Sequence, residues 1–430
     1  MSTLSATNTV TATAAEIAAI AARAAIPPLA LGERKTVVAA MSGGVDSAVT
    51  ALLLRDAGYQ VIGITMHLYS GDETGAIACG TGSCCGLEGV EDARAICQTL
   101  DIPFYPLNFE RQFEQHVIAP FAAAYAEGQT PNPCLNCNRH LKFAALLGRA
   151  VGMGADYLAT GHYANVSRDP DGACRLFRAA DPTKDQSSVL YTFSQQQLAR
   201  TLFPLGPLTK REVRTLARAH GLPVAEKPES MDICFVPDGD YAKIVAERHP
   251  EAFIPGEIVD TRGAVLGRHG GIGHYTVGQR RGLHVAMGER RYVVALRPEA
   301  NQVVIGTADD LMTTALVADD VQFIAGAPPS GPVEIEATVR YRSTPMRATL
   351  IANASREVRL AFAEGFAQPA ATPGQAVVFY QGDEVIGGGT IRTVERGAGW
   401  VPTADDLAIT PPVTALAVIA PDAIAVLGGS

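Results

Sequence analysis

Residues 42–47, with the sequence Ser-Gly-Gly-Val-Asp-Ser, constrain the fold more than any other part of this chain. They follow the apolar run 37–41 and lead into the apolar stretch 48–54, which predicts a strand, a glycine turn and a helix. Two glycines let the backbone turn tightly and approach an anion without an intervening Cβ. The turn amides and the positive end of the helix then face that anion. The segment predicts a phosphate-binding loop, the alternative being an ordinary strand–helix turn of small residues.

Asp46 is unusual in a simple phosphate-binding loop, because its carboxylate repels phosphate unless a cation bridges the two. A carboxylate in this position predicts bound Mg²⁺. The Gly-Lys-Ser/Thr ending of a Walker loop is missing from residues 42–47, which disfavours γ-phosphate transfer. The hexapeptide resembles the pyrophosphate-binding loop of the ATP-pyrophosphatase superfamily. That resemblance implies cleavage of ATP to AMP and pyrophosphate, with AMP attached to an oxygen of the substrate.

The length of 430 residues predicts two or three domains, and 47% hydrophobic residues suffice for buried cores. With a net charge of −9, a nucleic-acid partner needs a local basic surface. We expect no transmembrane helix, since no run of about 18 apolar residues occurs, and no export signal in the nearly uncharged residues 1–30. A cytoplasmic location is expected, in which the eight cysteines are thiols with chemical roles and not a disulfide framework.

Predicted strands and helices alternate over residues 35–160, which indicates an α/β fold with a doubly wound parallel sheet. The catalytic domain built on this sheet is expected to span residues 35–225. The strand expected at 61–66 is almost continuously apolar, as in a strand covered on both faces. Ligands of such sheets bind beyond the carboxyl ends of the strands, where residues 42–47, Met66 and Gly161 fall. A helix is predicted at 208–222, opening with the capping-box spacing of Thr209 and Glu212.

The remaining regions differ from this domain in composition and in the pattern of their apolar residues. Residues 1–34 are predicted to be an N-terminal arm, either mobile or holding a short amphipathic helix at 14–25. Glycine is frequent in a small linking domain at 226–300. Short alternating runs separated by turns predict a C-terminal antiparallel β-barrel at 301–398, followed by a tail at 399–430.

Two segments, both predicted to be loops, carry the most informative cysteines: 130–139, with Cys134 and Cys137, and 230–235, with Cys234. A predicted helix with basic residues follows Cys137, and positive potential at a helix start favours a thiolate. Cys137 is therefore a candidate nucleophile, whereas the mostly apolar neighbours of Cys234 give no argument for activation. The basic residues are Arg139, His140 and Lys142.

Several motifs in the order of the chain resemble those of the bacterial tRNA-specific 2-thiouridylases. Besides residues 42–47, they are Thr-Pro-Asn-Pro at 130–133 with Cys137 and Asn138, Gly-His-Tyr-Ala at 161–164, Lys-Asp-Gln-Ser at 184–187, Asp-Ile-Cys-Phe at 232–235, Gly-His-Tyr-Thr-Val-Gly-Gln-Arg-Arg-Gly-Leu at 273–283 and Thr-Pro-Gly-Gln at 372–375. The resemblance covers residues 35–395, and both ends of the chain lie outside it.

This resemblance implies a reaction in which ATP, with Mg²⁺, adenylates O2 of the wobble uridine 34 of a tRNA. A cysteine persulfide then supplies the sulfur, giving 2-thiouridine, AMP and pyrophosphate. Cys234 matches the cysteine that receives the persulfide. Cys137 matches the partner that attacks the persulfide, frees the sulfur and leaves a Cys137–Cys234 disulfide. The implied partners are tRNAs, with Lys, Glu and Gln acceptors expected, and a cysteine desulfurase or sulfur-relay protein.

The resemblance also assigns binding residues. Those matching nucleotide contacts are Ala40, Met41, Ser42, Gly43, Gly44, Val45, Asp46, Ser47, Met66 and Gly161. Those matching the loop around the target base are Asn132, Pro133 and Cys134. Those matching tRNA contacts are His162, Lys184, Asp185, Gln186, Arg340, Tyr341 and Gln375.

One position departs from the family pattern: Cys134 stands where many members carry Asp, so an acid/base role for that carboxylate does not carry over. Cys134, Cys137 and Cys234 together suit a [4Fe–4S] cluster with one open position, an alternative to the persulfide pair. Cys134 and Cys137 alone would suit half a zinc site. Cys79, Cys84, Cys85 and Cys97 form another group, in which Cys97 is expected to lie in a core. Cys84 and Cys85 either bind a metal or, as we favour, have no role.

Two rival functions remain open from the residues. Another ATP pyrophosphatase, such as an amidotransferase-coupled synthetase of a small metabolite, explains residues 42–47 but not the cysteine pair or the barrel. A non-catalytic RNA-binding or sulfur-carrier protein leaves the nucleotide loop unexplained. Without the resemblance, arginines such as Arg139, Arg280 and Arg340 would be taken for solvated surface charges.

Overall fold

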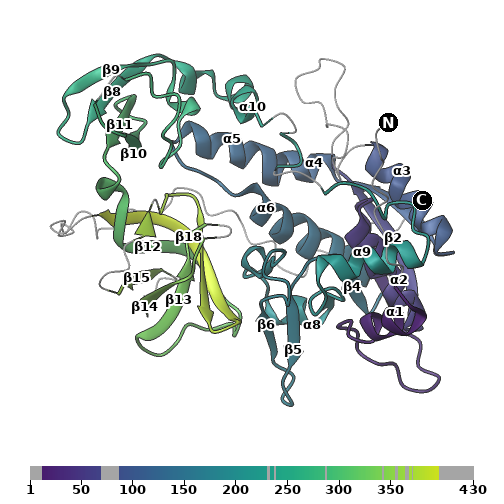
Figure 1. Cartoon of the computed structure of the whole chain (residues 1–430). Helices are drawn as coiled ribbons and strands as arrows, with labels where there is room; N and C mark the ends of the chain where they lie inside the picture. Colours follow the sequence, from purple (N-terminus) through teal and green to yellow (C-terminus); the bar gives the residue numbers. More distant parts are fainter. Residues whose placement is uncertain are drawn as a thin grey trace, which may run out of the picture.

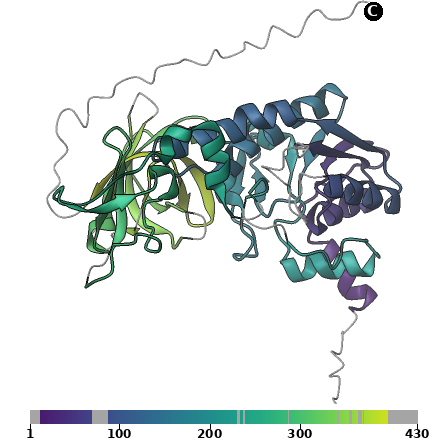
Figure 2. The ribbon, with the colours of Figure 1, turned by 90° about the horizontal axis from the view of Figure 1, so that it is seen from above.

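The structure is a computed structural model that describes residues 12–68, 87–229, 233–236, 239–285, 288–340, 343–353, 357–363, 368–369 and 371–396. An α/β domain and a β-barrel lie at opposite ends of the molecule, and a small mixed sheet lies next to the barrel (Figures 1 and 2). Within this described part, none of the helices has the length and apolar character of a membrane span.

A parallel sheet with the strand order β3-β2-β1-β4-β7 forms the centre of the α/β domain. In β1, Val37 and Ala39 point into one hydrophobic core, and Val38 points into the other. A strand buried on both faces requires helices on both sides of the sheet, so the predicted doubly wound fold is confirmed. The strands are β1 (Thr36–Ala40), β2 (Gln60–His67), β3 (Phe104–Asn108), β4 (Tyr157–Ala159) and β7 (Thr201–Leu202).

The helices divide between the two cores. One core takes α1 (Ala14–Ala21), α2 (Val45–Asp56), α3 (Leu87–Thr99) and α9 (Lys210–Ala219). The other takes α4 (Glu110–Phe113), the π-helical η1 (Glu114–Ile118), α5 (Ala119–Ala126), α6 (Pro133–Asn136), the π-helical η2 (Cys137–Leu146), α7 (Leu147–Gly152), α8 (Gln195–Ala199) and α10 (Tyr241–Arg248). The capping box predicted at Thr209 and Glu212 opens α9, as expected. The helix expected at 14–25 ends earlier, at Ala21.

The linking region holds a mixed sheet with the order β10-β11-β8-β9, in which β11 and β8 are parallel. Helices α5 and α10 lie close together where this region meets the α/β domain (Figure 1). Tyr125 of α5 stacks there on Tyr241 of α10, with ring centroids 4.2 Å apart. The strands are β8 (Gly256–Asp260), β9 (Val265–His269), β10 (Tyr292–Arg297) and β11 (Gln302–Gly306). Short 3-10 turns are η3 (Ser187–Val189), η4 (Pro250–Phe253), η5 (Ile272–His274) and η6 (Asp309–Leu311).

The predicted antiparallel barrel is confirmed, because its strand order β12-β15-β14-β13-β17-β18 closes through β12–β18 pairing. The hairpin of β5 and β6, which belongs to the α/β region of the sequence, extends this sheet by pairing Leu176 with Val385 of β18. The strands are β5 (Asn165–Arg168), β6 (Cys174–Phe177), β12 (Met312–Phe323), β13 (Val333–Thr338), β14 (Met346–Ala352), β15 (Val358–Phe362), β16 (Gln368–Pro369), β17 (Ala376–Gln381) and β18 (Glu384–Arg396). The domain boundaries at 225, 300 and 398 stay predictions.

Candidate active site

The loop between β1 and α2 has the conformation that its glycines allow. Gly43 has a φ of 69°, and a Cβ there would lie 2.5 Å from the carbonyl oxygen of Gly89 in α3. Gly44 is the N-cap residue of α2, so the first-turn amides of that helix open onto the loop. Glycine is required at position 43 both by the backbone angle and by the close approach of α3.

Two serine hydroxyls hold the loop closed. The Ser42 amide donates to Ser47 Oγ at 3.2 Å, and the two serine oxygens lie 3.3 Å apart. Ser47 Oγ in turn donates to the Gly44 carbonyl at 3.0 Å. These bonds preorganise the loop, which lowers the entropy lost when a phosphate binds.

The predicted nucleotide residues meet at one edge of the parallel sheet. Gly161 follows β4, and a Cβ there would come within 2.9 Å of the Asp46 and Ser47 backbone. Met66 lies near the carboxyl end of β2, and Thr65 Oγ1 donates to the Met41 carbonyl at 2.9 Å. We call the site formed by residues 42–47, Gly161 and Lys210 the nucleotide edge.

Lys210, which the sequence reasoning missed, pairs with Asp46 at this edge. Its Nζ lies 2.6 and 2.7 Å from the two Asp46 carboxylate oxygens, and Tyr163 donates its hydroxyl to Asp46 Oδ1 at 2.8 Å. Burial and the neighbouring Asp46 raise the pKa of Tyr163, so its hydroxyl keeps its proton. The only sequence signal for Lys210 was its place directly after the Thr209 cap.

The segment with Cys134 and Cys137 is helical from Pro133 on, so the predicted loop is confirmed for residues 130–132 and was wrong for 133–139. The Asn132 side chain caps α6 by accepting from the Cys134 amide at 3.1 Å, and Pro133 occupies the first turn. Proline fits that position because its missing N–H would have no intrahelical acceptor. Cys134 is exposed, whereas Cys137, a turn further on, is partly buried.

Two of the three basic residues after Cys137 have partners of their own. Arg139 pairs with Asp320 of β12, an ion pair that ties η2 to the barrel. His140 stacks on His116 with 4.9 Å between ring centroids. Burial, then His116 and Arg139, lower the pKa of His140, so this imidazole is neutral at pH 7. His140 therefore adds no positive charge beside Cys137, Arg139 is paired with Asp320, and the role of Cys137 as a nucleophile stays a prediction.

Cys234 lies beside the same hydrophobic core as Cys137, and both are partly buried. The neighbouring Phe235 packs edge-on against Phe113 and Phe121, with centroids 5.6 and 5.2 Å away. Among the residues that the structure describes, no group of three His, Cys, Asp or Glu side chains is arranged to hold a metal ion. Cys79, Cys84 and Cys85 lie outside those residues.

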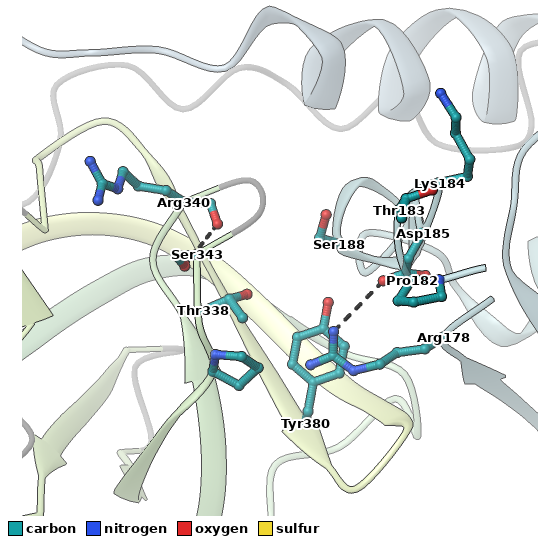
Figure 3. A pocket seen from close by; sticks show the side chains of 11 residues that line it. Arg178, Pro182, Thr183, Lys184, Asp185, Ser188, Thr338, Arg340, Ser343 and Tyr380 are labelled. Carbon is teal, nitrogen blue, oxygen red and sulfur yellow. Dashed lines mark hydrogen bonds and ion pairs between the residues drawn. The ribbon is translucent and has the colours of Figure 1, made fainter. Parts of the chain in front are cut away.

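A cleft of about 550 Å³ lies between the α/β domain and the barrel (Figure 3). Arg178 and Lys184 line one side and Arg340 the other, so three cationic side chains border it. Arg178 lies over the Tyr380 ring at 3.6 Å and pairs with Asp185 at 3.7 Å. The structure thus brings three predicted tRNA contacts, Lys184, Asp185 and Arg340, to one cleft, and adds Arg178 and Tyr380, which sequence reasoning did not find.

The other predicted tRNA contacts lie elsewhere. His162 is 8% exposed, lies 2.7 Å from Thr160 Oγ1 through Nδ1, and packs against Phe143. Burial, then Lys142, hold the pKa of His162 well below its ordinary value. Gln186 accepts from the Tyr163 amide at 3.1 Å. These observations give His162 and Gln186 structural roles, and their contact with tRNA stays a prediction.

Gln375 lies in a barrel turn that touches the segment before the cysteine helix. The Thr130 amide donates to the Pro373 carbonyl at 3.0 Å, and a Cβ on Gly374 would lie 2.9 Å from that of Gln129. The turn therefore sits beside the residues that lead into Asn132. Tyr341, the last predicted tRNA contact, lies outside the described residues.

Comparisons with known proteins place this geometry in a family. Residues 35–238 match a family model described as a tRNA methyl transferase HUP domain. Residues 242–307 match a tRNA methyl transferase PRC-barrel domain, and residues 313–391 an aminomethyltransferase beta-barrel domain. A solved U34-tRNA thiolase of Methanococcus maripaludis with its [4Fe-4S] cluster is similar at a TM-score of 0.30 and 17% identity, covering 55% of this chain and 74% of that one. Likeness at this level carries no argument about chemistry.

Curated relatives match far more closely. The tRNA-specific 2-thiouridylase MnmA of Moorella thermoacetica is 51% identical over 364 residues, which cover 83% of this chain and 99% of the relative. That of Lachnoclostridium phytofermentans is 48% identical over 357 residues, with the same coverage. Identity at this level over nearly the whole of each relative shows that the chain belongs to the tRNA-specific 2-thiouridylase family.

Proposed function

We propose that this enzyme uses ATP to adenylate O2 of the wobble uridine of a tRNA and then replaces that oxygen with sulfur. Family membership supports the reaction, and the observation that carries it in the structure is the glycine loop at residues 42–47. Backbone amides at a helix N-terminus bind phosphate groups, and a loop closed by its own serines is ready to receive them. Mg²⁺ enters as the complex of ATP.

Adenylation forms a bond from uridine O2 to the α-phosphorus and breaks the bond to pyrophosphate. Cys234 carries the transferable sulfur as a persulfide. The Cys137 thiolate attacks Cys234 Sγ, forms the Cys137–Cys234 disulfide and releases hydrosulfide, which attacks C2 of uridine and displaces AMP. A thiol reductant then restores both cysteines.

The cationic cleft between the α/β domain and the barrel is the tRNA surface of this proposal. Phosphate contacts supply much of the affinity for nucleic acid, and Arg178, Lys184 and Arg340 bring positive charge to the cleft in a chain of net charge −9. Asp185 and Glu229, which pair with Arg178 and Lys184, offset part of that charge. The target uridine then reaches the start of α6, formed by Asn132, Pro133 and Cys134. The substrates are tRNAs with Lys, Glu and Gln acceptors, the sulfur comes from a cysteine desulfurase or relay protein, and the location is cytoplasmic.

Mass analysis of nucleosides from tRNA incubated with the enzyme, Mg·ATP and a persulfide donor tests the function. We expect 2-thiouridine at position 34, dependent on ATP. Pyrophosphate release that needs no tRNA would instead favour a small-metabolite synthetase, and no release at all a non-catalytic protein. Purified recombinant enzyme excludes other modifying enzymes from the assay, and tRNA transcribed in vitro carries no modification before the reaction.

An iron–sulfur version of the same reaction is the second candidate, and Cys134, in place of the Asp of many relatives, favours it. The described residues do not bring three such ligands together, which speaks against a cluster in this arrangement. Anaerobic purification with iron and sulfide analysis decides between the two. Active protein without cluster absorbance removes the cluster, and activity that rises with iron content removes the persulfide pair.

A further inference from the structure

Lys210 lies at the nucleotide edge with its backbone fixed. It is the first residue of α9, after the Thr209 cap, and its amide donates to Asp181 Oδ2 at 3.0 Å. Asp181 is buried and also accepts a hydrogen bond from the Thr183 amide, so its carboxylate fixes the first residue of α9 in place. The Lys210 side chain reaches from this base to Asp46 and remains 12% exposed.

The Lys210–Asp46 ion pair offsets the repulsion that the Asp46 carboxylate would exert on a phosphate bound by residues 42–47. Asp46 stands in the first turn of α2, where helix amides would receive a phosphate, and like charges at such distances repel. A cation beside Asp46 removes that repulsion. The structure places the Lys210 ammonium there, in contact with both carboxylate oxygens.

The ion pair lies at the nucleotide edge, where the Asp46 side chain is 33% exposed and that of Lys210 12%. Asp46 Cβ lies 3.0 Å from where a Cβ on Gly161 would stand, beside a residue that matches nucleotide contacts. An ammonium has three N–H donors. Two of them face Asp46, and the Lys210 ammonium also forms a longer ion pair with Glu229, at 3.6 Å.

We propose that Lys210 is a phosphate-binding residue of the ATP site. Its ammonium neutralises Asp46 before ATP arrives and then donates to a phosphate oxygen of the bound nucleotide, without a metal ion between the two. The inference rests on the proposed use of ATP and adds to it a binding residue outside the glycine loop.

Calorimetric titration of the full chain with ATP in EDTA tests the proposal. Wild type should bind ATP without metal, and Lys210→Gln should weaken that binding about tenfold or more, the usual scale for loss of a charged hydrogen bond. Lys210→Arg, which keeps the charge, should restore most of the affinity. Lys35→Gln is the matched control, because Lys35 also pairs with a carboxylate, Glu33, but precedes β1 at the opposite edge of the sheet.

A double-variant comparison separates phosphate binding from mere neutralisation of Asp46. In an Asp46→Asn background no carboxylate charge remains to be neutralised. If Lys210 donates to phosphate, adding Lys210→Gln still lowers ATP affinity in EDTA. Equal affinities of Asp46→Asn and of the double variant would overturn the proposal, as would equal affinities of wild type and Lys210→Gln.

The outcomes distinguish this inference from the proposed function. Failure of wild type to bind ATP even with Mg²⁺ removes the proposed function itself. Binding with Mg²⁺ but none in EDTA leaves that function standing and overturns the role of Lys210. Thermal unfolding of each variant confirms that the comparison is between folded proteins.

Discussion

The nucleotide edge and the cationic cleft bind anions by different means. At the nucleotide edge the loop 42–47 comes from one stretch of chain, and its shape depends on backbone angles and small residues such as Gly43 and Ser47. The cleft takes side chains from segments more than a hundred residues apart in the sequence, such as Arg178 and Arg340. The first is a property of a motif, and the second exists only once the barrel has packed against the α/β domain.

This difference predicts opposite responses to mutation. A site built from backbone amides loses its affinity when a single added atom displaces the chain, because the amides move together and not one at a time. A side-chain cluster loses one contact at a time and keeps the rest. The following variants sharpen or break that contrast, beginning with one that separates both regions from the sulfur chemistry.

Cys234→Ser should abolish 2-thiouridine formation while leaving tRNA binding and pyrophosphate release intact, since a hydroxyl cannot carry a persulfide. Nucleoside mass analysis, filter binding and a pyrophosphate assay measure the three steps. Cys174→Ser, which alters a buried cysteine of β6, is the control for general damage. Retained thiolation would refute the role of Cys234.

Gly43→Ala should lower ATP affinity about 100-fold, or near 3 kcal/mol, because the new Cβ meets Gly89 and the residue must leave its positive φ. Gly154→Ala is the matched control. Gly154 has a φ of 83° but nothing within 4 Å of an added Cβ, so it carries the strain without the clash. Similar ATP affinities of the two variants would show that the close approach of α3 is unimportant.

His162 should make stability fall with acid if its role is structural. Its pKa is lowered in the folded state, so the unfolded state binds a proton first as the pH falls below about 6.5. The free energy of unfolding of wild type should then drop, relative to His162→Asn, by about 1.4 kcal/mol per pH unit until the native imidazole protonates. Urea unfolding between pH 7 and pH 5 measures this, with the exposed His220→Asn as control.

Parallel stability curves for wild type and His162→Asn, together with weaker tRNA binding by the variant, would reverse that assignment. His162 would then be a tRNA contact, and the cleft would extend to the end of β4.

Arg340→Ala should have the smallest effect, about 1 kcal/mol of tRNA affinity, and should reduce the salt dependence of binding by about one phosphate contact. Binding measured over a series of salt concentrations gives the slope. Arg175→Ala, which removes an exposed arginine paired with Glu384, should leave the slope unchanged. If Arg340→Ala lowered tRNA affinity by as large a factor as Gly43→Ala lowers ATP affinity, the two regions would not differ in their response to mutation.

Sequence reasoning found the nucleotide loop, the doubly wound sheet and the barrel because each depends on local pattern: glycines, apolar periodicity and turns. It missed Lys210, Arg178 and Tyr380, whose partners Asp46 and Asp185 become neighbours only through tertiary packing. It also misjudged the cysteine segment as a loop. Asn132 followed by Pro133 is a helix-start signal that was available there.

The pairing of β6 with β18 has a consequence for the order in which this chain folds. Leu176 of β6 pairs with Val385 of β18, so the edge of β6 stays unpaired until nearly all of the barrel sequence has been synthesised. Contacts this distant in sequence slow folding and leave strand edges exposed to intermolecular pairing. The α/β domain made alone would keep that open edge permanently, and we expect it to aggregate where the full chain does not.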